Sequence, residues 1–176
     1  MALKTRDDFE SKRKQGQVPP NMKDCYVLRC RDAKVQVSAA GNRNIALECE
    51  FVDPVEKEFG GKVYDLSALK HTFYLSLEDP DESSDGINQT FDVMETLELE
   101  PVLDPEEPDT KQFEGLVFEA IIDSVERKQM KPDPTKKGKM IPITNAEGKE
   151  ISSGWQTQAF PNSICGLANV ETQPML

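Results

Sequence analysis

The sequence of residues 24–52 is DCYVLRCRDAKVQVSAAGNRNIALECEFV, and this stretch decides the fold. Apolar and polar side chains alternate in residues 44–52, which is typical of a strand with one buried face. Residues 24–37 contain several β-formers and are predicted to be the partner strand. The SAAGN segment between them carries Gly41-Asn42, a pair that tolerates the positive φ values of a tight turn. The stretch therefore predicts an antiparallel hairpin.

The rest of the chain is predicted to supply three more strands and one helix. They are strand pieces at 62–66 and 72–77 that together make the third strand, a helix at 87–97 with one apolar stripe, a strand at 115–125, and a last strand at 155–160. Ser84 or Asp85 is expected to cap the helix, and Pro101 is expected to stop it. Both faces of the 115–125 strand are largely apolar, which predicts a central position in the sheet.

This order of elements predicts a mainly β fold. Strand, strand, strand, helix, strand, long loop, strand is the order of the OB-fold, a five-stranded Greek-key barrel, here with one helix between strands 3 and 4. The barrel is expected to span residues 24–160. An irregular arm (residues 1–23) is expected before it, and a flexible tail (residues 161–176) after it. The long loop at residues 124–154 is expected to carry a small hairpin of its own.

Charge is distributed unevenly along this acidic chain. The 176 residues include 21 basic and 32 acidic side chains, for a net charge of −11. Residues 78–114 contain 14 acids and one base, whereas residues 127–139 contain six bases and one acid. An acidic total argues against non-specific wrapping by DNA or by anionic lipid, but the two runs predict separate acidic and basic faces. The basic run contains Pro132, Pro134 and Gly138 and is expected to be a flexible loop.

The sequence contains no signature of metal, cofactor or catalytic chemistry. Its four cysteines form no C-x-x-C pair, and because the start of the chain lacks an apolar signal segment they are expected to be reduced thiols in the core. His71 is the only histidine, and no nucleophile-elbow or phosphate-loop motif occurs. We therefore expect no enzyme activity, no cofactor and no metal. No apolar run approaches the ~20 residues of a membrane span, so no membrane partner is expected.

Binding of unpaired nucleic acid requires cations that follow the phosphate backbone and exposed rings that stack on bases. The first candidates are the cations of the long loop, namely Arg127, Lys128, Lys131, Lys136, Lys137 and Lys139. Trp155 follows this loop and is the second candidate, and Tyr64 and Tyr74 of the third strand come next. Each ring can alternatively be a packing residue. Arg29 and Arg31 can likewise be neutralised by the glutamates of the second strand, across the first hairpin.

Four short features lie in the order found in a known family. They are VPP at 18–20, SAAGNRN leading into IALECEF at 38–51, GGKVYD at 60–65 and GLVFEA at 115–120. Over residues 17–137 the chain resembles the phage-encoded single-stranded DNA-binding proteins of the OB-fold class. The resemblance implies a protein that coats unpaired DNA without sequence choice during phage DNA replication or recombination, in the cytoplasm of an infected bacterial host.

The resemblance also implies a DNA surface and partner proteins. That surface maps onto Lys34, Arg43, Tyr64, Tyr74 and the basic loop. Many single-strand binders end in an acidic tail with an aromatic tip that recruits polymerases, whereas this chain ends in NVETQPML, with one acid. The acidic stretch at 78–114 is therefore the expected contact for replication or recombination proteins. The oligomeric state is left open.

Two other functions remain open on the sequence alone. Glu126 and Lys128 form an E-x-K pattern that, with Asp123 and Asp65, could hold Mg²⁺ in a metal-dependent nuclease. The barrel could instead be the protein-interaction module of a phage structural or adaptor protein. Mg²⁺-dependent DNA cleavage separates the nuclease from a DNA-binding protein, and salt-sensitive DNA affinity separates the adaptor from both.

Overall fold

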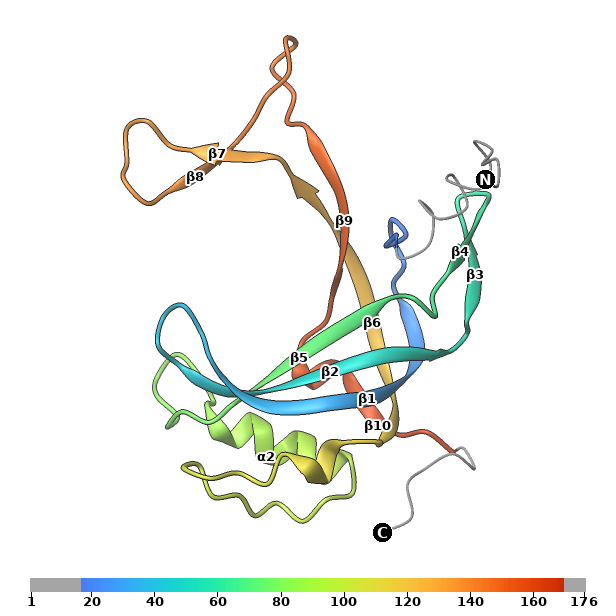
Figure 1. Cartoon of the computed structure of the whole chain (residues 1–176), viewed down its shortest axis with the longest axis vertical. Coiled ribbons are helices and arrows are strands. Elements are labelled where there is room, and N and C mark those ends of the chain that lie inside the picture. The colour runs from blue at the N-terminus through green and yellow to red at the C-terminus, as the bar shows by residue number, and fades with distance from the viewer. Residues whose placement is uncertain (1–16, 170–176) are drawn as a thin grey trace, which may run out of the picture.

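The computed structural model describes residues 17–169, which form a mainly β fold with one α-helix in that range (Figure 1). The strands are β1 (Asp24–Val37), β2 (Arg43–Asp53), β3 (Glu56–Phe59), β4 (Lys62–Asp65), β5 (Lys70–Ser76), β6 (Val117–Lys128), β7 (Met130–Pro132), β8 (Met140–Pro142), β9 (Ser152–Gln158) and β10 (Ile164–Leu167). The helices are α2 (Ile87–Thr96) and two 3-10 turns, η1 (Lys111–Phe113) and η2 (Pro161–Ser163). Within the described range, no helix has both the length and the apolar character needed to cross a lipid bilayer.

Six strands form one antiparallel sheet, in which β6 is an interior strand. The order is β10-β6-β1-β2-β5, and β9 pairs with the later part of β6. β6 therefore has partners on both edges, as its two apolar faces predict. Its side chains Phe118, Ala120 and Ile122 are fully buried, and Val117 is buried as well. The prediction of a central strand is confirmed.

The predicted hairpin of β1 and β2 is confirmed, with its turn at residues 38–42. Gly41 adopts a φ of 87° and donates its N–H to the Ser38 carbonyl, 2.9 Å away. The side chains of β2 that alternation places inside all lie in the core: Ile45, Leu47, Cys49 and Phe51. Local pattern and tertiary packing agree in this hairpin, which is why it can be read from the sequence.

The four cysteines divide into a buried and an exposed pair. Cys30 and Cys49 lie opposite each other in the β1–β2 register and are buried, as expected for small apolar side chains. The expectation of a core position is wrong for Cys25 and Cys165, which are exposed. All four are free thiols. The two exposed cysteines point outward because the inward positions beside them are taken by larger apolar side chains.

α2 lies against one side of the sheet (Figure 1) and contributes Val93 and Met94 to the core, and Leu97 directly after the helix is buried there as well. The apolar stripe predicts this helix to within one residue at its C-terminal end, but the predicted N-cap is wrong. Gly86 is the N-cap, with a φ of 54°, and neither Ser84 nor Asp85 takes that role. A Cβ at Gly86 would lie 2.5 Å from a backbone oxygen, so glycine is required there. The helix ends at Thr96, before the expected stop at Pro101.

The sheet does not close into a barrel within residues 17–169. β5 and β9 are the strands at which a five-stranded OB barrel would close, but no backbone ladder joins them. They meet through side chains instead, with His71 Nδ1 lying 2.8 Å from Thr157 Oγ1. The mainly β class and the position of the helix, between β5 and β6, are confirmed. The architecture is an open sheet.

Small hairpins extend from the sheet. The strand piece expected at residues 62–66 is confirmed as β4, but it belongs to one of these hairpins and not to the third strand of the sheet, β5. β3 pairs with β4 around Gly60-Gly61, which both have positive φ and so suit a two-residue turn. The flexible loop expected at residues 127–139 is instead the end of β6 and most of a hairpin, because β7 pairs with β8 and Gly138 turns the chain with a φ of 84°. The hairpin expected within the long loop, around residues 140–143 and 149–151, is found only in part. Met140–Pro142 pairs with β7 instead, whereas Thr144 and Glu150 form a bridge and the Ile151 N–H donates to the Ile143 carbonyl at 3.0 Å.

Both ends of the described chain belong to the core. The weakly structured tail expected from residue 161 is wrong up to residue 167, because η2 leads into β10, which pairs with β6 and buries Ile164. Most of the arm expected at 1–23 falls on residues 1–16, outside the described residues. Its last part is not an arm, since Met22 is fully buried and its N–H donates to the Ser124 hydroxyl at 3.1 Å.

Candidate nucleic-acid interface

Three of the predicted DNA-binding side chains line one pocket of about 440 Å³: Tyr64 of β4, Arg127 of β6 and Trp155 of β9. The β6–β9 register explains part of this arrangement. Gly154 lies opposite Arg127, so no side chain of β9 faces the guanidinium at that position. Gln17, Val18 and Pro20 complete the lining. This hollow, called the Trp155 pocket below, gathers two rings and a cation from strands that are far apart in the sequence.

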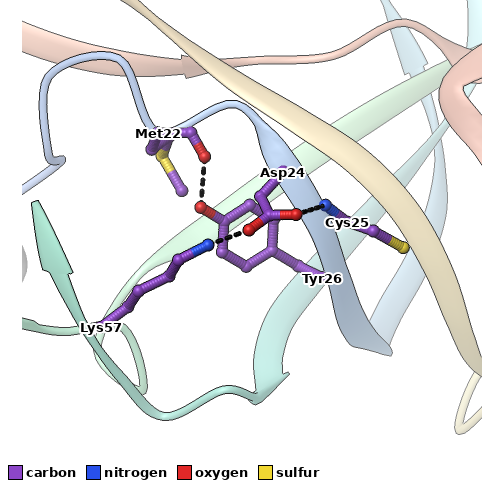
Figure 2. Close-up of polar contacts among 5 residues, drawn as sticks. All are labelled: Met22, Asp24, Cys25, Tyr26 and Lys57. Atoms are coloured by element: carbon purple, nitrogen blue, oxygen red, sulfur yellow. Dashed lines mark hydrogen bonds and ion pairs between the residues drawn. The ribbon is translucent and has the colours of Figure 1, made fainter.

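The β3–β4 hairpin that carries Tyr64 is fastened to β1 (Figure 2). Lys57 of β3 forms an ion pair with Asp24, and its ammonium nitrogen lies 5.4 Å from the ring centre of Tyr26. The hydrogen bond from Lys57 holds the pKa of the Asp24 carboxyl below its usual range. Tyr26 is itself buried and donates its hydroxyl proton to the Met22 carbonyl (Figure 2). These contacts hold the hairpin against the sheet and so set the position of Tyr64.

Four lysines of the predicted basic loop are carried by the β7–β8 segment, residues 130–142, called the basic hairpin below. They are Lys131, Lys136, Lys137 and Lys139. All four are exposed, and within residues 17–169 none of them forms an ion pair. Figure 1 shows the hairpin projecting beyond the end of β6, on the far side of the sheet from α2. Cations held this close together repel one another, and a bound polyanion would relieve that repulsion.

Two predicted cations already have partners. The Arg43 guanidinium donates to the carbonyls of Pro105 and Glu106, at 2.8 and 3.2 Å, so the acidic segment occupies it. Lys128 is paired with Glu126, and that hydrogen bond raises the pKa of the Lys128 ammonium. Each of these cations keeps spare N–H donors, but part of its hydrogen-bonding capacity is already used within the protein.

The outer face of the first hairpin is largely neutralised, which decides between the two alternatives for its arginines. Arg29 and Arg31 both lie near Glu50 Oε1, at 3.4 and 3.6 Å, and the other glutamate of β2 pairs with Lys70. Lys34, farther along β1, is exposed, and within residues 17–169 it forms no ion pair. Lys34 is far along the chain from most residues of the Trp155 pocket, and its side chain does not line that pocket.

Tyr74, the remaining predicted ring, lies on β5 and is 50% exposed. It does not line the Trp155 pocket but a separate groove of about 620 Å³ between β5 and β9, called the β5–β9 groove below. Phe160 lines the same groove, is 62% exposed and is not among the predicted site residues. The available signal for Phe160 is weak, because it is only the last residue of the strand predicted at 155–160, directly before Pro161.

The buried side chain of His71 connects the two walls of this groove, β5 and β9. Burial lowers the pKa of its imidazole, and the nearby backbone of Ala159 acts in the opposite direction. The ring is therefore neutral at pH 7, and it contacts Thr157 on β9 and packs edge-on against Phe73, with ring centres 4.6 Å apart. A proton added to this ring would be a buried charge.

The stability of the protein is expected to fall as the pH is lowered from 7 to 5. In this window the unfolded chain protonates His71, whose usual pKa is about 6.5, while the folded protein resists protonation because the ring is buried. His71 is the only histidine, so a His71→Gln variant is expected to lose this dependence. The part of the slope that His71 contributes cannot exceed about 1.4 kcal/mol per pH unit, the limit for one proton. Urea unfolding at pH 7, 6 and 5 measures it.

The Asp24 carboxylate does not contribute to this dependence. The pKa of Asp24 is lowered by its hydrogen bond from Lys57, so the stability that it adds is lost only below about pH 4. Equal slopes for wild type and His71→Gln between pH 7 and 5 would show that His71 is not the titrating group.

The residues of the nuclease alternative are not gathered into a metal site. Among residues 17–169, no three His, Cys, Asp or Glu side chains come close enough to hold a metal ion together. Glu126 is paired with Lys128, and Asp65 accepts hydrogen bonds from the backbone N–H and the hydroxyl of Ser67. The E-x-K pattern thus gains no support from the geometry.

Comparison with known proteins assigns neither a family nor a function. No family model matches the chain, and no curated protein or solved structure is significantly similar to it. The placement of its own side chains is therefore the basis for a functional assignment.

Proposed function

We propose that the protein binds single-stranded DNA without sequence selectivity, through an open, OB-like sheet. The Trp155 pocket is the observation that carries this proposal, because Tyr64, Arg127 and Trp155 converge there from three strands. Rings stack on unpaired bases, and a guanidinium beside them can bind phosphate or stack on a base itself. The four lysines of the basic hairpin supply further positive charge for phosphates along the strand.

The preference for unpaired strands follows from the rings. In a duplex each base already stacks on its neighbours, so its face is not available to Trp155 or Tyr64. In a single strand the faces are free, and each stack contributes about 1–3 kcal/mol. Because every base has such a face, binding of this kind tolerates any sequence.

The order of elements supports the OB-like part of the proposal. β1, β2 and β5 precede α2, and β6 and β9 follow it, which is the order of an OB-fold whose closure between β5 and β9 is incomplete. The loop between the last two strands of an OB-fold commonly contacts nucleic acid. The basic hairpin lies between β6 and β9, in the corresponding segment of this chain.

The acidic segment, residues 78–114, supports a division into two faces. Glu78, Asp79 and Asp81 line a pocket that also contains Arg43, whose guanidinium is held by backbone carbonyls of the same segment. These carboxylates repel phosphate, so DNA is expected on the side of the basic hairpin. We propose the acidic segment as the contact for basic surfaces of replication or recombination proteins in a phage-infected bacterium.

A fluorescence-anisotropy titration tests the proposal. The full-length protein is titrated into a labelled thymidine 20-mer at two salt concentrations, with unlabelled duplex as competitor. We expect binding that weakens steeply with salt and that the duplex competes for poorly. Equal competition by duplex, or no salt-sensitive binding at all, would contradict the proposal, and the second result would favour the protein-interaction module.

Replacing Trp155 by alanine is expected to weaken binding to the thymidine 20-mer about 5- to 150-fold, the equivalent of one lost stack of about 1–3 kcal/mol. The loss should be similar at both salt concentrations, because stacking releases no counterions. A Trp155→Phe variant keeps an aromatic face and should retain most of the affinity. Trp155→Ala binding as well as wild type would remove the Trp155 pocket from the DNA surface.

A further inference from the structure

The β5–β9 groove differs in chemistry from the rest of this molecule. Among the described residues, every side chain that lines it is uncharged at neutral pH, including the buried imidazole of His71. The chain as a whole has 30% charged residues and a net charge of −11. A neutral hollow of about 620 Å³ in such a chain does not fit a charged ligand, and it points to a neutral one.

Two rings are exposed in this groove without serving the core. Tyr74 is 50% exposed and Phe160 is 62% exposed, and neither belongs to the buried cluster or packs against it. On β5 the inward positions beside Tyr74 are filled by Phe73 and Leu75. Exposed aromatic faces that contribute little to folding are available to stack on a flat ligand.

Three amides lie among the polar groups of the groove, beside the hydroxyls of Thr72 and Thr157 and the imidazole of His71. Gln89 of α2 and Gln156 and Gln158 of β9 line it together with the two rings. Each amide offers both a donor and an acceptor, so the three can pair with the hydrogen-bonding edge of any nucleobase. Aromatic rings and amides together therefore suit a flat, neutral heteroaromatic ligand whose edge carries hydrogen-bond donors and acceptors.

A contact between buried side chains holds the two walls of the groove, β5 and β9, in place. His71 Nδ1 lies 2.8 Å from Thr157 Oγ1 and so joins β5 to β9, which no backbone ladder links. This contact fixes the spacing between the strand that carries Tyr74 and the one that leads to Phe160. A preformed spacing lowers the entropic cost of binding a ring between them.

We propose that the β5–β9 groove is a second base-binding site, in which an unpaired nucleobase stacks on Phe160 and Tyr74 and is hydrogen-bonded by the glutamine amides. This inference rests on the proposed function, because it concerns the same single-stranded DNA. Phosphates lie outside the groove, since it offers them no cation. They are also repelled on its far side, where Tyr74 borders the pocket lined by Glu78 and Asp79.

The groove and the Trp155 pocket share no lining residue, so their contributions can be separated by mutation. The decisive variants are Phe160→Leu, which removes the ring but keeps an apolar side chain, and Phe160→Tyr, which keeps the ring. Phe160 is exposed, so neither change is expected to affect folding. Binding is measured with a thymidine 20-mer and with a 20-mer of the same backbone in which every base is absent.

Phe160→Leu is expected to bind the thymidine 20-mer about 5- to 150-fold more weakly than wild type, with an unchanged salt slope. Its affinity for the abasic 20-mer should equal that of wild type, because no base is present to stack. Phe160→Tyr should bind both oligonucleotides as wild type does. This pattern assigns the loss to a stack on the ring and not to phosphate contacts.

Two outcomes overturn the inference and are distinguishable. If wild type binds the 20-mer and Trp155→Ala weakens it, but Phe160→Leu does not, the groove is not a base site while the proposed function stands. That result is also the one expected if the groove holds a peptide instead of DNA. If wild type binds neither oligonucleotide, the proposed function itself fails and the inference fails with it.

Discussion

A variant in which Lys131, Lys136 and Lys137 are replaced by alanine is expected to bind single-stranded DNA about 100-fold more weakly than wild type at 0.1 M monovalent salt. The three lysines lie on the basic hairpin, are exposed and form no ion pair within residues 17–169. Each phosphate that they neutralise releases condensed counterions, which contributes about 0.7 to the slope of log affinity against log salt for a single strand.

Loss of three such contacts therefore flattens that slope by about 2. The slope is the more specific readout, because a general loss of folding would lower affinity without following the salt concentration in this way. Anisotropy titrations of the labelled thymidine 20-mer at four or more salt concentrations measure it. At high salt, where counterion release contributes little, the variant and wild type should converge.

A matched variant controls for the change in net charge. Lys23, Lys62 and Lys111 are exposed lysines just before β1, on β4 and on η1, outside the basic hairpin, and within residues 17–169 they form no ion pair. Their replacement by alanine removes the same charge. This control should leave the slope nearly unchanged. If both triple variants flatten the slope equally, the effect is due to overall charge and the basic hairpin is not the phosphate-binding element.

The Phe118→Ala variant is expected to lose about 3–5 kcal/mol of its free energy of unfolding. Phe118 is fully buried on β6, opposite Leu28 of β1 and Leu167 of β10, and its ring centre lies 6.0 Å from that of Phe73. Truncation removes the apolar surface of the ring and leaves a cavity where three strands meet, which the close-packed sheet cannot fill by collapsing.

Urea unfolding at pH 7 measures this loss, followed by circular dichroism and by the fluorescence of Trp155, the only tryptophan. Ile121→Ala is the control, because Ile121 lies on the same strand but is 42% exposed. It is expected to cost less than about 1.5 kcal/mol. Similar losses for both variants would mean that the centre of β6 is not the packed junction described above.

The elements that could be predicted from the sequence are those whose signal is local. The β1–β2 hairpin follows from alternation over residues 44–52 and from a turn that suits glycine, and α2 follows from an apolar stripe of three to four residue spacing. The central place of β6 follows from its two apolar faces. By contrast, β10 has four residues, too few to show a period, and it is a strand because β6 offers it an open edge.

The predicted DNA-binding residues divide in the same way. The lysines at residues 131–139 could be recognised as a group because they are close together in sequence. Arg43 could not be recognised as occupied, because its partners Pro105 and Glu106 lie in a segment some sixty positions away. No local pattern marks Phe160 as a binding residue, because its exposure depends on how β9 and η2 are placed in the fold.

The amino-acid sequence by itself determined the β-rich class, the hairpin at residues 24–52, the helix α2 and the separation of acidic from basic charge. Periodicity and charge runs act over a few neighbouring residues, so they can be read without knowing the fold. Only the tertiary structure decided that Tyr64, Arg127 and Trp155 share a pocket and that β5 and β9 leave an open groove. Those arrangements depend on pairing between strands far apart in the chain, whose register is set by burial of the whole core and not by any short stretch of sequence.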